Sequence, residues 1–379
     1  MRSLDGLPDF PFTVEAQDGN ARAGLLETPR GTVQTPCFMP VGTKGTVKAI
    51  TPDRLEAVGA QIILANTYHL ALRPGSDVVR RLGGLHRFMQ WDGPILTDSG
   101  GYQVFSLRDT ARVDDGGVEF RSIYDGSRHV FTPERAMAEQ AALGADLVMC
   151  LDQCPSGAAG QAGVAEAVDR TAVWAARCKA AHQRREGMGT DGPQMLIGIV
   201  QGGVSAPLRR ESAERLQEVG FPGYAIGGLT VGEDRQAMLD TTEFTAALLP
   251  ENRLRYFMGI GDPSGLVEVI ARGVDVFDCV LPTRTARMGT AFTSCGRLNL
   301  RNAEHALSDG PLEEGCPCTA CRGFSRGAIR HFVMQKEILG LMLLTEHNLV
   351  FLTRLVRRAR EAIMAGTFSA FRKQEHAPW

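Results

Sequence analysis

The chain has 379 residues, of which 44% are hydrophobic and 22% are charged, and its formal net charge is −2. This composition is typical of an ordinary soluble globular protein, and the charge argues against a protein that coats nucleic acid indiscriminately. The N-terminus has no apolar core for a signal peptide, and no uninterrupted apolar run approaches the length of a membrane span. Nine cysteines, an odd number, indicate a reducing cytoplasm rather than disulfides. The length allows two average domains or one large α/β barrel with an appendage.

The N-terminal segment 12–36 predicts an antiparallel flap. Polar and apolar residues alternate along it, and turn signals occur at Asp18-Gly19 and Arg30-Gly31. We expect this flap to cover the N-terminal end of the domain that follows.

Eight short apolar runs follow the flap and predict β-strands. They lie at 37–41, 62–65, 94–97, 147–151, 196–200, 224–227, 255–260 and 275–280. Stretches with helical periodicity, such as 133–143 and 161–186, separate most of them. Short strands that alternate with helices form parallel sheets, and eight such units predict a closed (β/α)8 TIM barrel. We therefore expect a single catalytic domain over 1–379.

A polar or otherwise distinctive residue stands at the end of seven predicted strands. These residues are Asn66, Asp98, Asp152, Gln201, Gly228, Met258 and Asp278. The active site of such a barrel lies at the C-terminal ends of its strands, so we expect the seven residues to converge there. Each one alone is explained about equally well as a cap or turn residue, and Met258 alone is better explained as core. Their convergence is what favours function.

Three cysteines and a histidine after the eighth strand predict a metal site. Cys316, Cys318 and Cys321 lie within six residues, and His347 follows after twenty-five intervening positions. Three thiolates and an imidazole form a closed tetrahedral shell, so we expect one structural Zn²⁺ per chain in a subdomain over 290–350. Thr345 is expected to cap the helix that carries His347, and a C-terminal helix is expected over 348–366. The alternative is a chance cluster of reduced cysteines or a redox pair.

Two basic stretches interrupt the otherwise balanced charge. Between Cys279 and Ala303 there are four arginines and no acidic residue, and a second stretch runs from Arg354 to Arg360. On charge alone, such stretches are as readily a solvated surface as a binding site.

Several longer motifs carry a resemblance to a known family. The motifs are TDSGGYQVFSL (97–107), CLDQC (150–154), VQGG (200–203), GGLTVGE (227–233) and DCVLPTRTARMG (278–289). Together with the cysteine and histidine spacing, they resemble the tRNA-guanine transglycosylases in matching order from about residue 12 to past residue 360. The extra C-terminal RNA-binding domains of the archaeal branch are missing, so the chain resembles the bacterial form.

The resemblance implies an activity and a mechanism. The bacterial enzymes replace the wobble guanine of tRNAs with GUN anticodons (those for Asp, Asn, His and Tyr) by 7-aminomethyl-7-deazaguanine (preQ1), in queuosine biosynthesis. Asp278 would be the nucleophile of a double displacement through a covalent ribose intermediate, and Asp98 would be the acid/base. Asn66 is expected near Asp278 and would orient it by a hydrogen bond.

The remaining site residues would bind the base and the RNA. Asp152 can accept hydrogen bonds from N1–H and the exocyclic amine of guanine, a pair of donors that adenine does not offer, and Gln201 and the Gly228 N–H can donate to O6. By resemblance, Tyr102 and Met258 would enclose the purine, and the Leu229 carbonyl would bind the aminomethyl group. Arg284 and Arg287 match positions that contact the uridine next to the target base in the tRNA anticodon loop.

The resemblance also implies a homodimer, although the segment 322–332 departs from the family pattern. Phe324 and His331 are kept, whereas Gly327 and Ala328 replace bulkier side chains of the dimer contact. Two other functions compete with an active transglycosylase. A non-catalytic tRNA-binding subunit is disfavoured by the presence of three aspartates, and a metal-dependent barrel hydrolase lacks metal ligands at the strand ends, where His69 is the nearby histidine.

Overall fold

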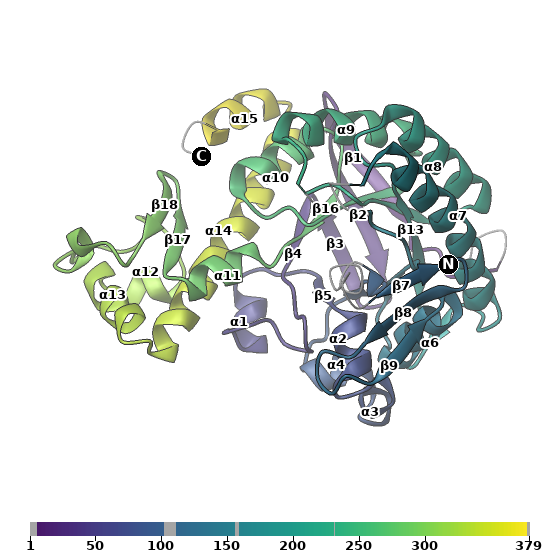
Figure 1. The fold of residues 1–379 in the computed structure, drawn as a ribbon. Coiled ribbons are helices and arrows are strands. Elements are labelled where there is room, and N and C mark those ends of the chain that lie inside the picture. The colour runs from purple at the N-terminus through teal and green to yellow at the C-terminus, as the bar shows by residue number, and fades with distance from the viewer. Residues whose placement is uncertain (1–5, 102–110, 156–158, 231, 377–379) are drawn as a thin grey trace.

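The computed structural model describes residues 6–101, 111–155, 159–230 and 232–376. Eight parallel strands form one sheet in the order β4-β16-β15-β14-β13-β10-β6-β5. Their bounds are β4 (Cys37–Met39), β5 (Ile63–Ala65), β6 (Ile95–Thr97), β10 (Leu147–Met149), β13 (Met195–Val200), β14 (Gly223–Ile226), β15 (Leu254–Met258) and β16 (Val276–Asp278). The chain just after β4 closes the barrel onto β5, because Leu64 N donates to Pro40 O (3.0 Å) and Gly42 N donates to Leu64 O (2.6 Å). The predicted (β/α)8 barrel is confirmed (Figure 1).

An antiparallel sheet of β1 (Phe12–Asp18), β2 (Ala21–Thr28) and β3 (Gly31–Thr35) covers one end of this barrel. Leu26 and Val33 pack into the apolar cluster that fills the barrel interior, together with Met39 and Ile197. The buried guanidinium of Arg22 pairs with Asp275, the residue immediately before β16. The sheet therefore lies at the N-terminal end of the strands, as predicted, and leaves the opposite end free for a site.

Helices surround the barrel. They are α1 (Pro52–Ala57), α2 (Thr67–Leu72), α3 (Ser76–Arg81), α4 (Gly84–Met89), α6 (Pro133–Leu143), α7 (Gln161–Gln183), α8 (Ala206–Val219), α9 (Arg235–Leu248) and α10 (Pro263–Ile270). Helix α6 has the predicted bounds because Pro133 follows an N-cap at Thr132, whose side chain accepts from Arg135 N, and Gly144 ends it in the left-handed region. A small antiparallel sheet that was not predicted, β7 (Arg112–Asp114), β8 (Gly117–Arg121) and β9 (Arg128–Phe131), lies between β6 and α6. A short hairpin, β11 (Met188–Gly189) and β12 (Gly192–Pro193), precedes β13.

A lobe separates β16 from the eighth helix of the barrel (Figure 1). It contains α11 (Leu281–Arg287), β17 (Thr290–Thr293), β18 (Gly296–Asn299), η2 (Ala303–His305), α12 (Thr319–Gly323) and α13 (Arg326–Met334). Helix α14 (Ile338–Met364) then returns to the barrel, where it contacts β4, and α15 (Phe368–His376) follows.

The expected bounds of this last long helix were wrong. Helix α14 begins at Ile338 and already carries His347 and Thr345 in its interior, so Thr345 is not its N-cap. The apolar run of 338–344 is itself helical, and Gly340 within it lies directly against Phe332 and Val333 of α13. Among the described helices, α14 is the one whose length and composition would suit a membrane span, yet more than half of its most apolar window is buried inside the protein.

Gly327 is explained by packing within the chain. A Cβ at this position would lie 2.8 Å from Ala306 O and 3.2 Å from Ser308 O, and Gly327 N donates to Ser308 O (2.8 Å). The small residue therefore allows α13 to lie directly on the 306–308 backbone.

Candidate active site

All seven predicted strand-end residues line one cavity of about 510 Å³ at the C-terminal ends of the strands. Leu229, Arg284 and Arg287 line the same cavity. Tyr102 lies outside the described residues. The predicted convergence of the seven strand-end residues is confirmed. It follows from the barrel itself, since parallel strands end at the same rim.

Asp278 ends β16 and is held through one carboxylate oxygen. Its Oδ1 accepts a hydrogen bond from the Tyr256 hydroxyl (2.6 Å) and another from Gly259 N (3.0 Å). Burial raises the pKa of Asp278, and the hydrogen bonds from Tyr256, Gly259 and its own backbone N–H act in the opposite direction because they favour the ionised form. The two bonds to Oδ1 fix the orientation of the carboxylate.

Tyr256 was not among the predicted site residues. It lies on β15 two positions before Met258, so both side chains face the barrel interior. Burial, together with the neighbouring charge of Asp278, raises the pKa of Tyr256 well above its usual value, so the hydroxyl stays protonated and donates. The two-residue spacing from Met258 is the sequence signal that would have identified it.

Asp98 and Asn66 form a pair on the neighbouring strands β6 and β5. Asn66 Nδ2 donates to Asp98 Oδ2, and Thr67 N donates to Asp98 Oδ1 (2.8 Å). The expectation that Asn66 bonds to Asp278 was therefore wrong. Residues Ala65 and Thr97 are in register, so the residues that follow them meet side by side, whereas β4 lies between β5 and β16.

Asp152 and Gln201 form a second buried polar pair in the cavity. Gln201 Nε2 donates to Asp152 Oδ2 (2.6 Å), and the Ser99 hydroxyl donates to Asp152 Oδ1 (3.2 Å). Burial raises the pKa of Asp152 to about 6, despite these hydrogen bonds. Gly228 is required beside them, since its φ is +67° and a Cβ would lie 2.1 Å from Gln201 Oε1. Gln201 Oε1 itself is buried without a hydrogen-bond partner in the described chain, which leaves acceptor capacity for a ligand.

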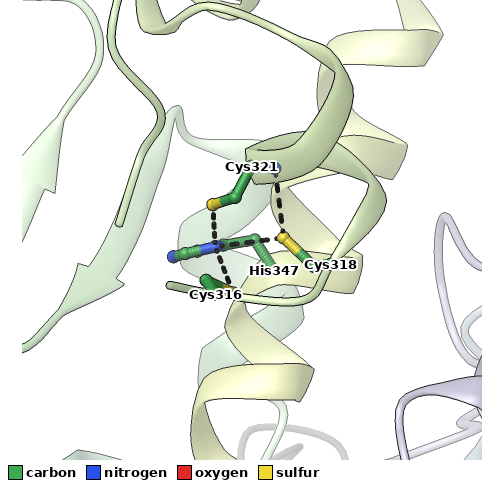
Figure 2. Close-up of side chains that lie close together, drawn as sticks. All are labelled: Cys316, Cys318, Cys321 and His347. Atoms are coloured by element: carbon green, nitrogen blue, oxygen red, sulfur yellow. Dashed lines mark hydrogen bonds between the residues drawn. The ribbon is translucent and has the colours of Figure 1, made fainter. Parts of the chain in front are cut away.

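The four predicted metal ligands converge in the lobe, as Figure 2 shows. His347 Nδ1 lies 3.7 Å from Cys316 Sγ, 3.5 Å from Cys318 Sγ and 3.3 Å from Cys321 Sγ. His347 Nε2 donates to Phe292 O (2.7 Å), which fixes the orientation of the ring and directs Nδ1 at the sulfurs. Three thiolates and one oriented imidazole nitrogen are the donor set of a closed tetrahedral site, so these residues can hold a metal ion as scaffold.

A parallel (β/α)8 barrel carries three aspartates in its mouth and a Cys3His cluster after its last strand, and paired carboxylates at one cavity are the groups that glycosyl-transferring enzymes use. The family model described as queuine tRNA-ribosyltransferase matches residues 17–378, and the chain belongs to this family.

Curated relatives with the same description agree with this assignment. The one from Pelotomaculum thermopropionicum is 52% identical over 363 residues, covering 96% of both chains. The one from Halothermothrix orenii is 53% identical over 354 residues, covering 93% of both. A third, from Desulforudis audaxviator, is 53% identical over 365 residues and covers 96% of both. The protein is thus a tRNA-modifying pentosyltransferase of queuosine biosynthesis.

Proposed function

We propose that this enzyme replaces the wobble guanine of GUN-anticodon tRNAs (Asp, Asn, His and Tyr) by 7-aminomethyl-7-deazaguanine, through a covalent bond between Asp278 and the ribose. The observation that carries the proposal is the position of two carboxylates, Asp98 and Asp278, in one cavity that a third, Asp152, also lines. Two carboxylates are what a retaining transfer at an anomeric carbon requires, and the third suits recognition of a guanine-type base.

The proposed reaction consists of two displacements. Asp278 Oδ2 forms a bond to ribose C1′ while the bond from C1′ to guanine N9 breaks, and the electron pair leaves with the base, which takes a proton from Asp98. The incoming base then gives its N9 proton to Asp98 and attacks C1′, which releases the Asp278 carboxylate. Two inversions retain the configuration of the ribose. In this role Asn66 and Thr67 position Asp98, while Tyr256 and Gly259 position Asp278.

The base would bind against Asp152, Gln201, Gly228 and Leu229, enclosed by Met258 and Tyr102. Before the base enters, the Gln201 amide nitrogen donates to Asp152, so this pair must rearrange for Gln201 to reach the base. The Asp152 carboxylate would then accept from guanine N1–H and the exocyclic amine.

Guanine affinity is expected to depend on pH through Asp152, whose pKa is about 6. Since guanine would donate two hydrogen bonds to the ionised carboxylate, binding is full above this pKa and is lost as the pH falls through it, by about tenfold per pH unit below the pKa. Isothermal titration of guanine between pH 5 and 8 measures this. Asp152→Asn should bind weakly with a flat profile, and a flat profile for the wild type would contradict the assignment.

Tyr256→Phe is expected to slow base exchange by about ten- to a hundredfold, because it removes a hydrogen bond to a charged carboxylate. The acid limb of the pH–rate profile should also move to higher pH, since that hydrogen bond lowers the pKa of Asp278. Tyr224→Phe on the adjacent strand β14 is the matched control, with its hydroxyl bound to Phe221 N. An unshifted profile would show that Tyr256 does not act on Asp278.

Residues outside the catalytic centre would also contribute to this function. Arg284 and Arg287 lie on α11 at the cavity rim and would contact the RNA next to the flipped nucleotide. The Cys3His cluster would hold one structural Zn²⁺, and the enzyme would act in the cytoplasm as a homodimer that uses the 322–332 segment.

The experiment that tests the proposal is incorporation of radiolabelled guanine into unmodified tRNA with a GUN anticodon. The expected result is label in acid-precipitable RNA, its release by excess 7-aminomethyl-7-deazaguanine, and no label in a tRNA whose wobble base is cytosine. Absence of label with tRNA still bound would instead support a non-catalytic tRNA-binding subunit.

A further inference from the structure

Arg209, in the first turn of α8, has a fully buried side chain. Its guanidinium donates to two main-chain carbonyl oxygens, through Nε to Gly203 O (2.7 Å) and through Nη1 to Val200 O (2.9 Å). Burial lowers the pKa of Arg209 to about 10, so the group is still charged at neutral pH. Burial of a charge is costly, and an apolar side chain of similar size would avoid that cost. Packing alone therefore does not explain the arginine.

The hydrogen bonds of Arg209 hold both ends of the turn that carries Gln201. Gln201 directly follows β13, and the next two residues, Gly202 and Gly203, have φ values of +136° and +55°. A segment rich in glycine is flexible unless other contacts fix it. A Cβ on Gly202 would lie 2.8 Å from Arg209 N, so α8 lies directly on the turn. Ser212, one turn further along α8, accepts from Gln201 N (3.1 Å).

Val200 O also joins the end of β13 to the end of β14. Gly227 N donates to this oxygen (3.0 Å), which therefore receives one hydrogen bond from β14 and one from Arg209. The end of β14 lies directly against the Gln201 side chain. A Cβ on Gly227 would lie 2.8 Å from Gln201 Nε2, and one on Gly228 would lie 2.1 Å from Gln201 Oε1. Arg209 thus fixes the main chain of Gln201 relative to that of Gly228.

We propose that Arg209 is a positioning residue for base recognition, which holds the Gln201 amide and the Gly228 N–H at the spacing that O6 of a guanine-type base requires. This inference rests on the proposed function, which assigns O6 to these two donors. Gln201 must leave Asp152 to reach the base, and a fixed main chain confines this change to side-chain torsions. Base binding then has fewer groups to order, which increases the affinity.

The test is a double-mutant cycle between Arg209 and Gln201, with the Kd of guanine from isothermal titration as the readout. Arg209→Lys keeps the positive charge but lacks the planar fork that reaches two carbonyl oxygens. It should weaken guanine binding by about five- to tenfold, and Gln201→Ala should weaken it at least as much. Because Arg209 acts partly through Gln201, the double variant should lose clearly less than the product of the two single effects.

Exchange kinetics separate positioning from a loss of stability. Arg209→Lys should raise the KM of guanine and leave kcat at saturating guanine near the wild-type value, because the proposed chemistry at the ribose belongs to Asp98 and Asp278. A variant that is merely unstable would lose kcat with KM unchanged. Arg22→Lys is the matched control, since Arg22 is also buried but pairs with Asp275 at the opposite end of the barrel. It should lower Tm and leave the KM of guanine unchanged.

Ser212→Ala tests the same turn if Arg209→Lys does not fold. The substitution removes the acceptor of Gln201 N and leaves the rest of α8 intact. It should weaken guanine binding by about two- to fivefold, again by less than the product of effects when combined with Gln201→Ala.

Two results separate this inference from the proposed function. If Arg209→Lys binds guanine as tightly as the wild type, or if its effect multiplies fully with that of Gln201→Ala, the positioning role is refuted. The same two outcomes for Ser212→Ala refute it where Arg209→Lys does not fold. If instead the wild type incorporates no labelled guanine into tRNA while the cycle still shows coupling, the proposed function fails and the positioning role stands.

Discussion

Asp278→Asn is expected to abolish base exchange, with a rate at least about 10⁴-fold below that of the wild type. An amide oxygen is a poor nucleophile, and the substitution keeps the size of the side chain and its acceptor for Tyr256 and Gly259. The variant should therefore fold normally and bind tRNA as tightly as the wild type. Initial rates of labelled-guanine incorporation and a filter-binding Kd measure the two properties separately.

Asp262→Asn is the matched control for this substitution. Asp262 caps α10, where its carboxylate accepts from Gly265 N (2.8 Å), and asparagine caps helices about as well as aspartate. Exchange by this control should stay near the wild-type rate. If Asp278→Asn itself kept more than about a tenth of the wild-type rate, Asp278 could not be the nucleophile.

Removal of one metal ligand is expected to have the largest effect on stability. Cys318→Ser should release the metal and lower the free energy of unfolding of the lobe by at least about 5 kcal/mol, because structural zinc contributes about 10–16 kcal/mol in small domains. His347 is fully buried on α14, so loss of the metal loosens the contact between that helix and the lobe. Limited proteolysis within 290–335 and metal content by mass spectrometry measure the effect.

The same lobe supplies a control, since Cys295 is exposed in the turn between β17 and β18 and lies outside the ligand cluster. Cys295→Ser should keep one zinc per chain and resist protease as the wild type does. A Cys318→Ser protein with full zinc content and unchanged protease resistance would contradict a structural metal site.

The barrel and most of the site could be predicted because both follow from local sequence patterns. Short apolar runs bounded by turn residues define strands such as β13, and the parallel arrangement then brings every strand end to one rim. The sequence therefore predicts that Asp98, Asp152 and Asp278 meet, and all three line one cavity.

The wrong predictions concern features that depend on the order of the strands in the sheet or on tertiary packing. In the sheet, β5 lies next to β6 and β16 lies next to β4, which places Asn66 beside Asp98 instead of Asp278. The order of the strands along the chain does not reveal these neighbours. Helix α14 begins at Ile338 because its apolar face is covered by the lobe and the barrel, which overrides the cap signal at Thr345. Tyr256 was missed because a tyrosine inside a strand is usually core, and its role depends on a 2.6 Å contact with the next strand.

Helix α14 joins the barrel to the lobe. It is both the eighth helix of the barrel, in contact with β4, and the carrier of the fourth metal ligand. Asn348, next to His347, accepts from Phe292 N (2.8 Å) and donates to Pro282 O (3.0 Å), at the start of the α11 helix that carries Arg284 and Arg287. The Cys3His cluster is thus connected to the rim of the cavity that carries Arg284 and Arg287 through one buried turn of helix.

Detection of the covalent intermediate would test directly whether Asp278 is the nucleophile. The wild-type enzyme is mixed with GUN-anticodon tRNA in the presence of guanine deaminase, which removes the released guanine, and the mixture is quenched in denaturant. We expect an RNA-linked band on a denaturing gel, with the RNA fragment mapped by mass spectrometry to the peptide that contains Asp278, and no such band for Asp278→Asn. A wild type that exchanges guanine without forming this adduct, or an adduct that persists in Asp278→Asn, would contradict a covalent mechanism through Asp278.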